Sequence, residues 1–194
     1  GVLLNNVDTI MISNYSDNLV GAVGNANLIF NLMYVLFSII GTATAVVVSQ
    51  YLGAELKDRI NTVYSVAFII NIAFGIALSA GLFFGAEFLM SLLGVPDVMI
   101  DDAVTYVQIV GGTIFLQSGF VVMNSIMRCN GLQRFGMISA MSVNVLNIIG
   151  NWLFLFGPLK VLNLGVAGVS ISTAFARLVQ LIILIVVFYG YKLG

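Results

Sequence analysis

Long apolar stretches separated by short polar connections dominate the pattern of this chain. Charged residues are absent from 18–54, 60–86, 103–127 and 135–159, and the stretch 161–191 contains Arg177 alone. Each stretch exceeds the roughly 20 residues that a helix needs to cross a hydrocarbon core about 30 Å thick. The apolar runs are continuous and do not alternate with polar positions, which favours transmembrane helices over a transmembrane barrel.

The polar connections divide the chain into predicted helices. Both prolines, Pro96 and Pro158, lie in connections, so no predicted span contains one. The pattern predicts an all-α membrane protein with one transmembrane domain over 1–194. Its six transmembrane helices are expected at 1–13, 27–51, 62–86, 102–127, 135–157 and 165–190. The first is too short to cross a bilayer and is interpreted as the end of a truncated helix.

Two rows of small residues are typical of closely packed membrane helices. Gly81 and Gly85 are four residues apart in the third predicted helix, and Gly168, Ser172 and Ala176 repeat this spacing in the sixth. Small side chains at such spacing let helix backbones approach one another. Both rows therefore predict helix contacts.

The basic residues outside the spans predict an orientation. Lys57 and Arg59 precede the third helix, Arg128 and Arg134 lie in the fourth connection, and Lys192 is near the end of the chain. With an even alternation of spans, these five fall on one side of the membrane and Lys160 alone falls on the other. Cytoplasmic loops carry the excess of Lys and Arg. We therefore expect a multi-pass protein of the cell (plasma) membrane with both ends of the chain cytoplasmic.

Composition excludes several classes of function. Of the 194 residues, 60% are hydrophobic and 8% are charged, whereas a soluble domain carries roughly 25% charged residues. The net charge of −1 leaves no basic run for binding nucleic acid, so that partner is not expected. There is no His and one cysteine, Cys129, so zinc sites, disulfide frameworks and His-based catalysis lack their residues. An enzyme is not expected, nor is a cofactor.

Two ionisable residues fall inside the predicted spans. Asp8 lies in the first segment and Arg177 lies near the middle of the sixth helix. A charge in hydrocarbon costs about 2.5–3.5 kcal/mol on insertion scales, so such a residue usually faces a cavity or a partner. Asp8 is interpreted as functional, with a solvated position at a helix end as the alternative. For Arg177, contact with a substrate and a structural role as an ion pair or helix cap are equally supported.

Asparagines form a stripe on the fifth predicted helix. Asn144, Asn147 and Asn151 are three and four residues apart, which places their amides on one face. Thr173 and Arg177 share a face of the sixth helix in the same way. Amides also hold neighbouring helices together, so a structural role remains open for each. Together with Asp8, the stripe and Thr173 offer hard oxygen ligands for a small cation, or a carboxylate that takes up a proton.

Five short motifs resemble the multidrug and toxic compound extrusion (MATE) transporters. They occur in the family's order, close to one per predicted helix end, across nearly the whole chain. They are Val-Asp-Thr-Ile at 7–10, Gln-Tyr-Leu-Gly-Ala at 50–54, Arg-Cys-Asn-Gly at 128–131, Asn-Ile-Ile-Gly-Asn at 147–151, and Gly-Val-Ala-Gly at 165–168 followed by Thr173. No single motif is diagnostic, but five in this order are specific.

The resemblance implies the N-terminal six-helix lobe of a twelve-helix antiporter. Its two lobes, related by a pseudo-twofold axis, would rock between inward-open and outward-open states. Drug-like, often cationic organic compounds would leave in exchange for Na⁺ or H⁺, and the partners would be these substrates, the lipid bilayer and a C-terminal lobe. The family's cation or proton site transfers to Asp8, Asn147, Asn151 and Thr173, with Asn144 and Arg177 as weaker candidates for the substrate cavity. Possible Na⁺ at that site is the only metal ion expected.

Asn151 stands where some members of the family have Asp. One carboxylate would then serve alone, so the coupling ion stays open between Na⁺ and H⁺. Two other functions also remain. One is a flippase for lipid-linked oligosaccharides, whose cavity would carry more basic residues than Arg177. The other is a non-transporting membrane scaffold subunit, in which Asp8 and the asparagines hold helices together.

Overall fold

A computed structural model describes residues 13, 17–55, 57–159 and 164–191 of the chain. No strand occurs in these residues, as expected for an all-α membrane protein. The helices are α2 (Asp17–Gly53), α3 (Lys57–Leu92), α4 (Asp97–Tyr106), the π-helical segment η1 (Val107–Gly111), α5 (Phe115–Cys129), α6 (Gln133–Leu155) and α7 (Gly165–Gly190). The helix predicted at 1–13 lies outside the described residues.

Five of the six predicted spans have counterparts in the described residues. The helices α2, α3, α6 and α7 are each long and apolar enough to cross a membrane. The fifth counterpart is a broken span. Its first part is α4 with η1, its second part is α5, and the two parts are bent by 46° relative to each other. The fold is therefore that of an all-α membrane lobe.

Two helices extend well beyond the predicted ranges. Helix α2 begins at Asp17 where the sequence predicted a connection at 14–17, and α3 continues past Glu87 to Leu92. Polar residues do not end α2. The side-chain N–H of Asn25, for example, donates to Gly21 O of the preceding turn at 2.9 Å. The 37 residues of α2 span about 55 Å, more than the hydrocarbon core requires. The length of each apolar stretch therefore predicted the part of the helix that crosses the membrane, but it did not predict the turns by which the helix continues beyond that part.

The span predicted as one helix at 102–127 is broken near its middle. After η1, the hydroxyl of Thr113 donates to Ile109 O at 3.0 Å, and the next α-helix begins at Phe115. Such breaks free backbone groups that must be satisfied by neighbours. The buried hydroxyl of Ser79 on α3 accepts a hydrogen bond from the Phe115 N–H at 3.1 Å. Gly111 and Gly112 lie directly before this break.

The Ser79 contact gives a testable consequence for stability. Ser79→Ala would leave the partly buried N–H of Phe115 without its acceptor, so we expect the free energy of unfolding to fall by about 1–2 kcal/mol. Thermal unfolding of the purified protein in detergent measures this change. Thr42→Ala is the matched control, because the exposed Thr42 hydroxyl donates only to Ser38 O of its own helix. Equal loss in both variants would contradict a role for Ser79 at the break.

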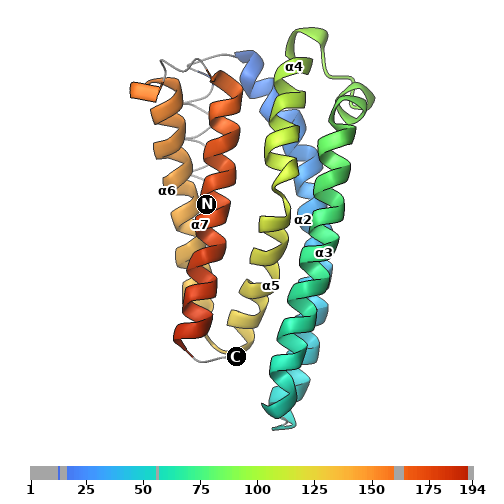
Figure 1. Cartoon of the computed structure of the whole chain (residues 1–194), viewed down its shortest axis with the longest axis vertical. Coiled ribbons are helices and arrows are strands. Elements are labelled where there is room, and N and C mark those ends of the chain that lie inside the picture. Colours follow the sequence, from blue (N-terminus) through green and yellow to red (C-terminus); the bar gives the residue numbers. More distant parts are fainter. Residues whose placement is uncertain (1–12, 14–16, 56, 160–163, 192–194) are drawn as a thin grey trace.

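The helices run up and down in two groups (Figure 1). Helices α6 and α7 pack mainly on each other, while α2, α3, α4 and α5 form the second group and α5 also contacts α7. The α2–α3 hairpin extends beyond the other helices at one end (Figure 1). The connections at 53–57 and 129–133 and the end of α7 lie at that same end. The sequence analysis predicted that the second and fourth connections and the end of the last helix lie on the same side, and this arrangement agrees with that prediction.

Small residues bring α6 and α7 close together. A Cβ added at Gly150 would overlap the hydroxyl of Ser172, and one at Gly168 would lie 2.8 Å from the Phe154 Cβ. The contact predicted for the row containing Gly168 and Ser172 is therefore confirmed. The prediction for Gly81 and Gly85 is wrong for the part of the chain that the structure describes, where a Cβ at either position meets nothing within 4 Å.

Candidate functional site

A polar pocket lies where the two helix groups face each other. It encloses about 400 Å³, within the range of sites for small molecules. Its lining comes from α2, α4 and α5 on one side and from α6 and α7 on the other. The lining residues are Val23, Asn27, Phe30, Asn31, Tyr34, Tyr106, Ile114, Gln117, Val143, Asn147, Thr173, Arg177 and Gln180. Nine of these thirteen side chains are polar, in spans that are otherwise largely apolar.

The structure brings some of the predicted site residues together in this pocket. Asn147, Thr173 and Arg177 all line it. Asn151 is 1% exposed and is not among the lining residues. Asn144 is also outside the lining, and its side-chain amide donates to Ala140 O of its own helix at 3.1 Å. Asp8 lies outside the described residues.

Several lining residues were missed by the sequence analysis. On α2, Asn27, Asn31 and Tyr34 are four and three residues apart and share one helical face. On α7, Gln180 continues the stripe that Thr173 and Arg177 begin. Both stripes were visible as polar positions at helical spacing within apolar spans. The remaining polar lining residues, Tyr106 and Gln117, flank the break in the fourth span, which the sequence analysis did not predict.

Arg177 is the one charged residue among the described residues that line the pocket. Its guanidinium carbon lies 5.6 Å from the centroid of the Phe30 ring, which is a cation–π contact. Phe30 in turn packs against Tyr106, with ring centroids 6.0 Å apart. Within the described residues, the buried Nη1 of Arg177 has no hydrogen-bond partner. The pocket therefore holds a positive charge with an unused donor.

Asn147 adds a hydrogen-bond acceptor to the pocket, in contrast to the donor of Arg177. Its buried Oδ1 has no hydrogen-bond partner among the described residues. The Thr173 hydroxyl, by contrast, donates to Val169 O at 3.1 Å and keeps its oxygen lone pairs available. Oxygen atoms of amides and hydroxyls are ligands for hard cations and acceptors for protonated groups. The pocket can therefore bind both donors and acceptors on a solute.

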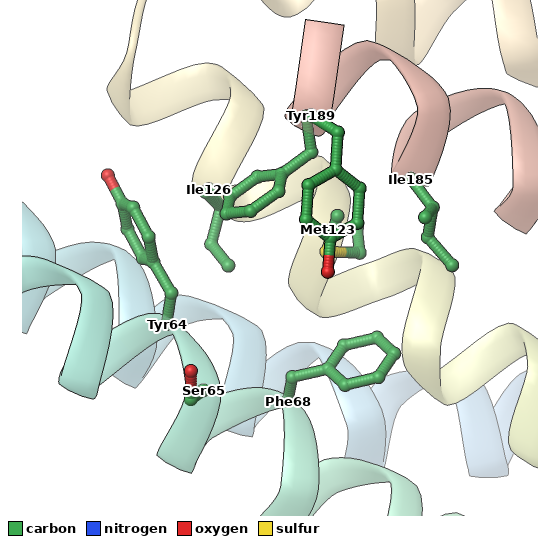
Figure 2. Close-up of a pocket in the computed structure, with 8 residues that line it drawn as sticks. Tyr64, Ser65, Phe68, Met123, Ile126, Ile185 and Tyr189 are labelled. Atoms are coloured by element: carbon green, nitrogen blue, oxygen red, sulfur yellow. The ribbon is translucent and has the colours of Figure 1, made fainter. Parts of the chain in front are cut away.

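A second pocket has a different chemistry. It lies between the beginning of α3 and the ends of α5 and α7, and Figure 2 shows side chains of all three helices converging on it. Its lining residues are Tyr64, Ser65, Phe68, Met123, Ile126, Ile185, Phe188 and Tyr189. The Tyr64 hydroxyl accepts a hydrogen bond from the Asn130 side chain at 2.8 Å, and no charged side chain lines the pocket. Aromatic packing dominates here, so the polar pocket is the candidate site.

Metal-ligating side chains do not cluster in the part of the chain that the structure describes. No group of three or more His, Cys, Asp or Glu residues is placed to hold a metal ion there. Cys129 instead contacts the Ser49 hydroxyl and Ala45 O, at 3.7 and 3.6 Å. The groups available to a solute are therefore those of the polar pocket.

Comparison with known proteins connects this architecture to transporters. The uncharacterized transporter YisQ of Bacillus subtilis is 40% identical over 186 residues, which are 96% of this chain and 41% of that protein. A probable multidrug resistance protein NorM of Streptococcus pneumoniae is 24% identical over 183 residues, 94% of this chain and 40% of that protein. The chain thus spans about two fifths of the length of these curated relatives.

A solved structure and a family profile agree with these relatives. A multidrug resistance MATE family transporter of the MOP superfamily, in an inward-facing conformation, matches with a TM-score of 0.85 and 21% identity. The match covers 96% of this chain and 41% of that one, and at this identity it shows a shared fold. The MatE family profile matches residues 2–153, well over half of the chain. The chain therefore belongs to the MatE family of membrane transporters.

Proposed function

We propose that this chain is the N-terminal lobe of a secondary active exporter of drug-like organic compounds. A second lobe of similar size would complete the transporter, because the chain spans about 41% of the length of its relatives. The polar pocket is the observation that carries the proposal. Nine polar side chains from five helical segments converge on it inside a membrane lobe, where polar groups are costly unless a solute uses them.

Antiport requires that a cation and a substrate bias the same conformational change. Asp8, Asn147 and Thr173 form the proposed cation or proton site, with Asn151 buried one turn along α6, and Arg177 contributes to the substrate cavity. Asn144, which bonds to its own helix outside the pocket lining, is left out of the proposed cavity. Asn147, Thr173 and Arg177 support this assignment because they line one pocket. Occupancy by Na⁺ or H⁺ neutralises the carboxylate of Asp8 and changes the relative stability of two packings of the lobe. Substrate is released in the packing that binds it more weakly.

The proposed orientation follows from the basic residues at one end of the bundle. Arg59, Arg128 and Arg134 are exposed near the end shared by the connections at 53–57 and 129–133. An excess of basic residues marks the cytoplasmic side. We place this end in the cytoplasm, in a protein of the cell membrane. Export then moves substrates toward the opposite end of the bundle.

The proposal is tested by efflux from everted membrane vesicles that contain the full-length protein. Gradients of Na⁺ and of H⁺ are imposed separately, and accumulation of a fluorescent organic substrate in the vesicle lumen is followed. We expect accumulation to follow one of the two gradients and to stop when that gradient is collapsed with an ionophore. Vesicles without the transporter are the control. A protein that moves no organic compound under either gradient would contradict the proposal and redirect the tests to lipid-linked substrates.

A further inference from the structure

We propose that the polar pocket binds the carboxylate group of an amphiphilic organic solute and that Arg177 is the residue that recognises it. This inference rests on the proposed function and specifies the class of substrate. It concerns the part of the pocket around Arg177, where the described lining presents a positive charge to the solute. Three features of the described residues support it.

The first feature is the sign of the charge. Arg177 is the charged residue among the thirteen described side chains that line the pocket. A guanidinium in a partly buried site repels an organic cation and attracts an anion, more strongly than it would in water. The solute group nearest to Arg177 should therefore be negatively charged.

The second feature is the unused donor of the guanidinium. Nη1 of Arg177 is buried and has no hydrogen-bond partner among the described residues, while the Phe30 ring covers the guanidinium at 5.6 Å. A planar guanidinium held by an aromatic ring keeps its N–H edge available for a planar partner. Carboxylates match that edge with two parallel hydrogen bonds. The arrangement therefore suits a carboxylate in the plane of the guanidinium.

The third feature is that the described lining combines a single positive charge with apolar side chains. One guanidinium balances one negative charge, whereas a pyrophosphate would need more cations than the described lining provides. Val23, Phe30, Ile114 and Val143 supply apolar surface for the body of the solute. Asn147 Oδ1, a second buried group with no partner in the described residues, can accept a hydrogen bond from a donor on that body. The pocket thus fits a monocarboxylate with an apolar frame and a hydrogen-bond donor.

A matched pair of dyes tests the inference with the purified full-length protein in detergent. The probes are a xanthene dye with a free benzoate carboxylate and its methyl ester, which differ in that charge and in one methyl group. Fluorescence polarisation measures the dissociation constant of each. We expect the acid to bind about tenfold more tightly than the ester, as hydrogen bonds to a charged group imply. An acid that binds no more tightly than the ester would overturn the inference.

Substitutions at Arg177 test whether this residue causes the preference for the acid. Arg177→Gln is expected to make the dissociation constants of the acid and the ester equal within about twofold, and Arg177→Lys is expected to keep part of the preference because the charge remains. Arg134→Gln is the matched control, since Arg134 is exposed at the beginning of α6. Size-exclusion profiles check that each variant is folded. A preference for the acid that survives in Arg177→Gln, or is lost in Arg134→Gln, would contradict the assignment to Arg177.

The dye measurements separate this inference from the proposed function. Binding of the acid through Arg177 without gradient-driven efflux would support the site and contradict the exporter. Gradient-driven efflux of the ester with no preference for the acid would support the exporter and overturn the carboxylate site.

Discussion

Asp8→Asn is expected to abolish gradient-driven efflux by the full-length protein and to leave the protein folded in the membrane. The amide has nearly the shape of the carboxylate, but it cannot take up a proton or neutralise a cation in the same way. Binding of the coupling ion would then no longer distinguish the two packings of the lobe, so the linkage to substrate release is lost. Efflux from everted vesicles, at matched protein levels, measures the effect as a fall to the background of vesicles without transporter.

Asp101→Asn is the matched control for this prediction. Asp101 is exposed on α4, so the same chemical change is expected to leave efflux unaltered. Wild-type efflux in Asp8→Asn would contradict the assigned role. Absence of the variant from the membrane would instead support the alternative in which Asp8 holds helices together. The two results are distinguished by measuring the amount of protein together with its activity.

Gly75→Val is expected to be the most destabilising single substitution at the α3–α5 contact. A Cβ at Gly75 would lie 2.9 Å from the Cα of Phe115 and would overlap the Ser118 side chain. Backbone atoms cannot rotate away, so α5 must shift, and the free energy of unfolding should fall by about 3 kcal/mol or more. The melting temperature of the detergent-purified protein measures this loss. Efflux should fall as well, because Ile114 and Gln117 beside the break line the polar pocket.

Gly81→Val provides the control on the same helix. A Cβ at Gly81 meets nothing within 4 Å in the described residues, so the substitution is expected to leave the melting temperature nearly unchanged. The two variants change helix propensity equally and differ only in what the new side chain contacts. Equal destabilisation in both would show that the close approach at Gly75 does not limit stability.

The membrane spans were predictable because insertion depends on the composition of each segment by itself. The charge-free stretches 18–54 and 135–159 contain most of α2 and most of α6, and the range predicted for the last helix coincides with α7 (Gly165–Gly190). The break after Gly111 was not predicted, because it depends on Ser79 from another helix. A hydroxyl from α3 satisfies the N–H that the break frees, and no pattern within 102–127 contains that information.

The candidate site was predictable in part for the same reason. Helical spacing placed Asn144, Asn147 and Asn151 on one face of α6, and it placed Thr173 and Arg177 on one face of α7. Spacing did not reveal that Asn147 lines the pocket while Asn144 bonds to its own helix and Asn151 is buried. A helical face is broad, and the packing of the neighbouring helix decides which of its residues reaches a cavity.

Local composition was enough to identify this chain as a helical membrane protein, to locate the segments long and apolar enough to cross a bilayer, and to show which polar residues those segments carry. These properties follow from local composition, since hydrocarbon excludes charge and requires each helix to satisfy its own backbone. The packing of the helices, which local composition does not contain, brings Asn27 and Asn31 of α2 into one pocket with Arg177 and Gln180 of α7. Residues so distant in sequence meet because whole helices pack against one another, and that packing is a property of all the spans together.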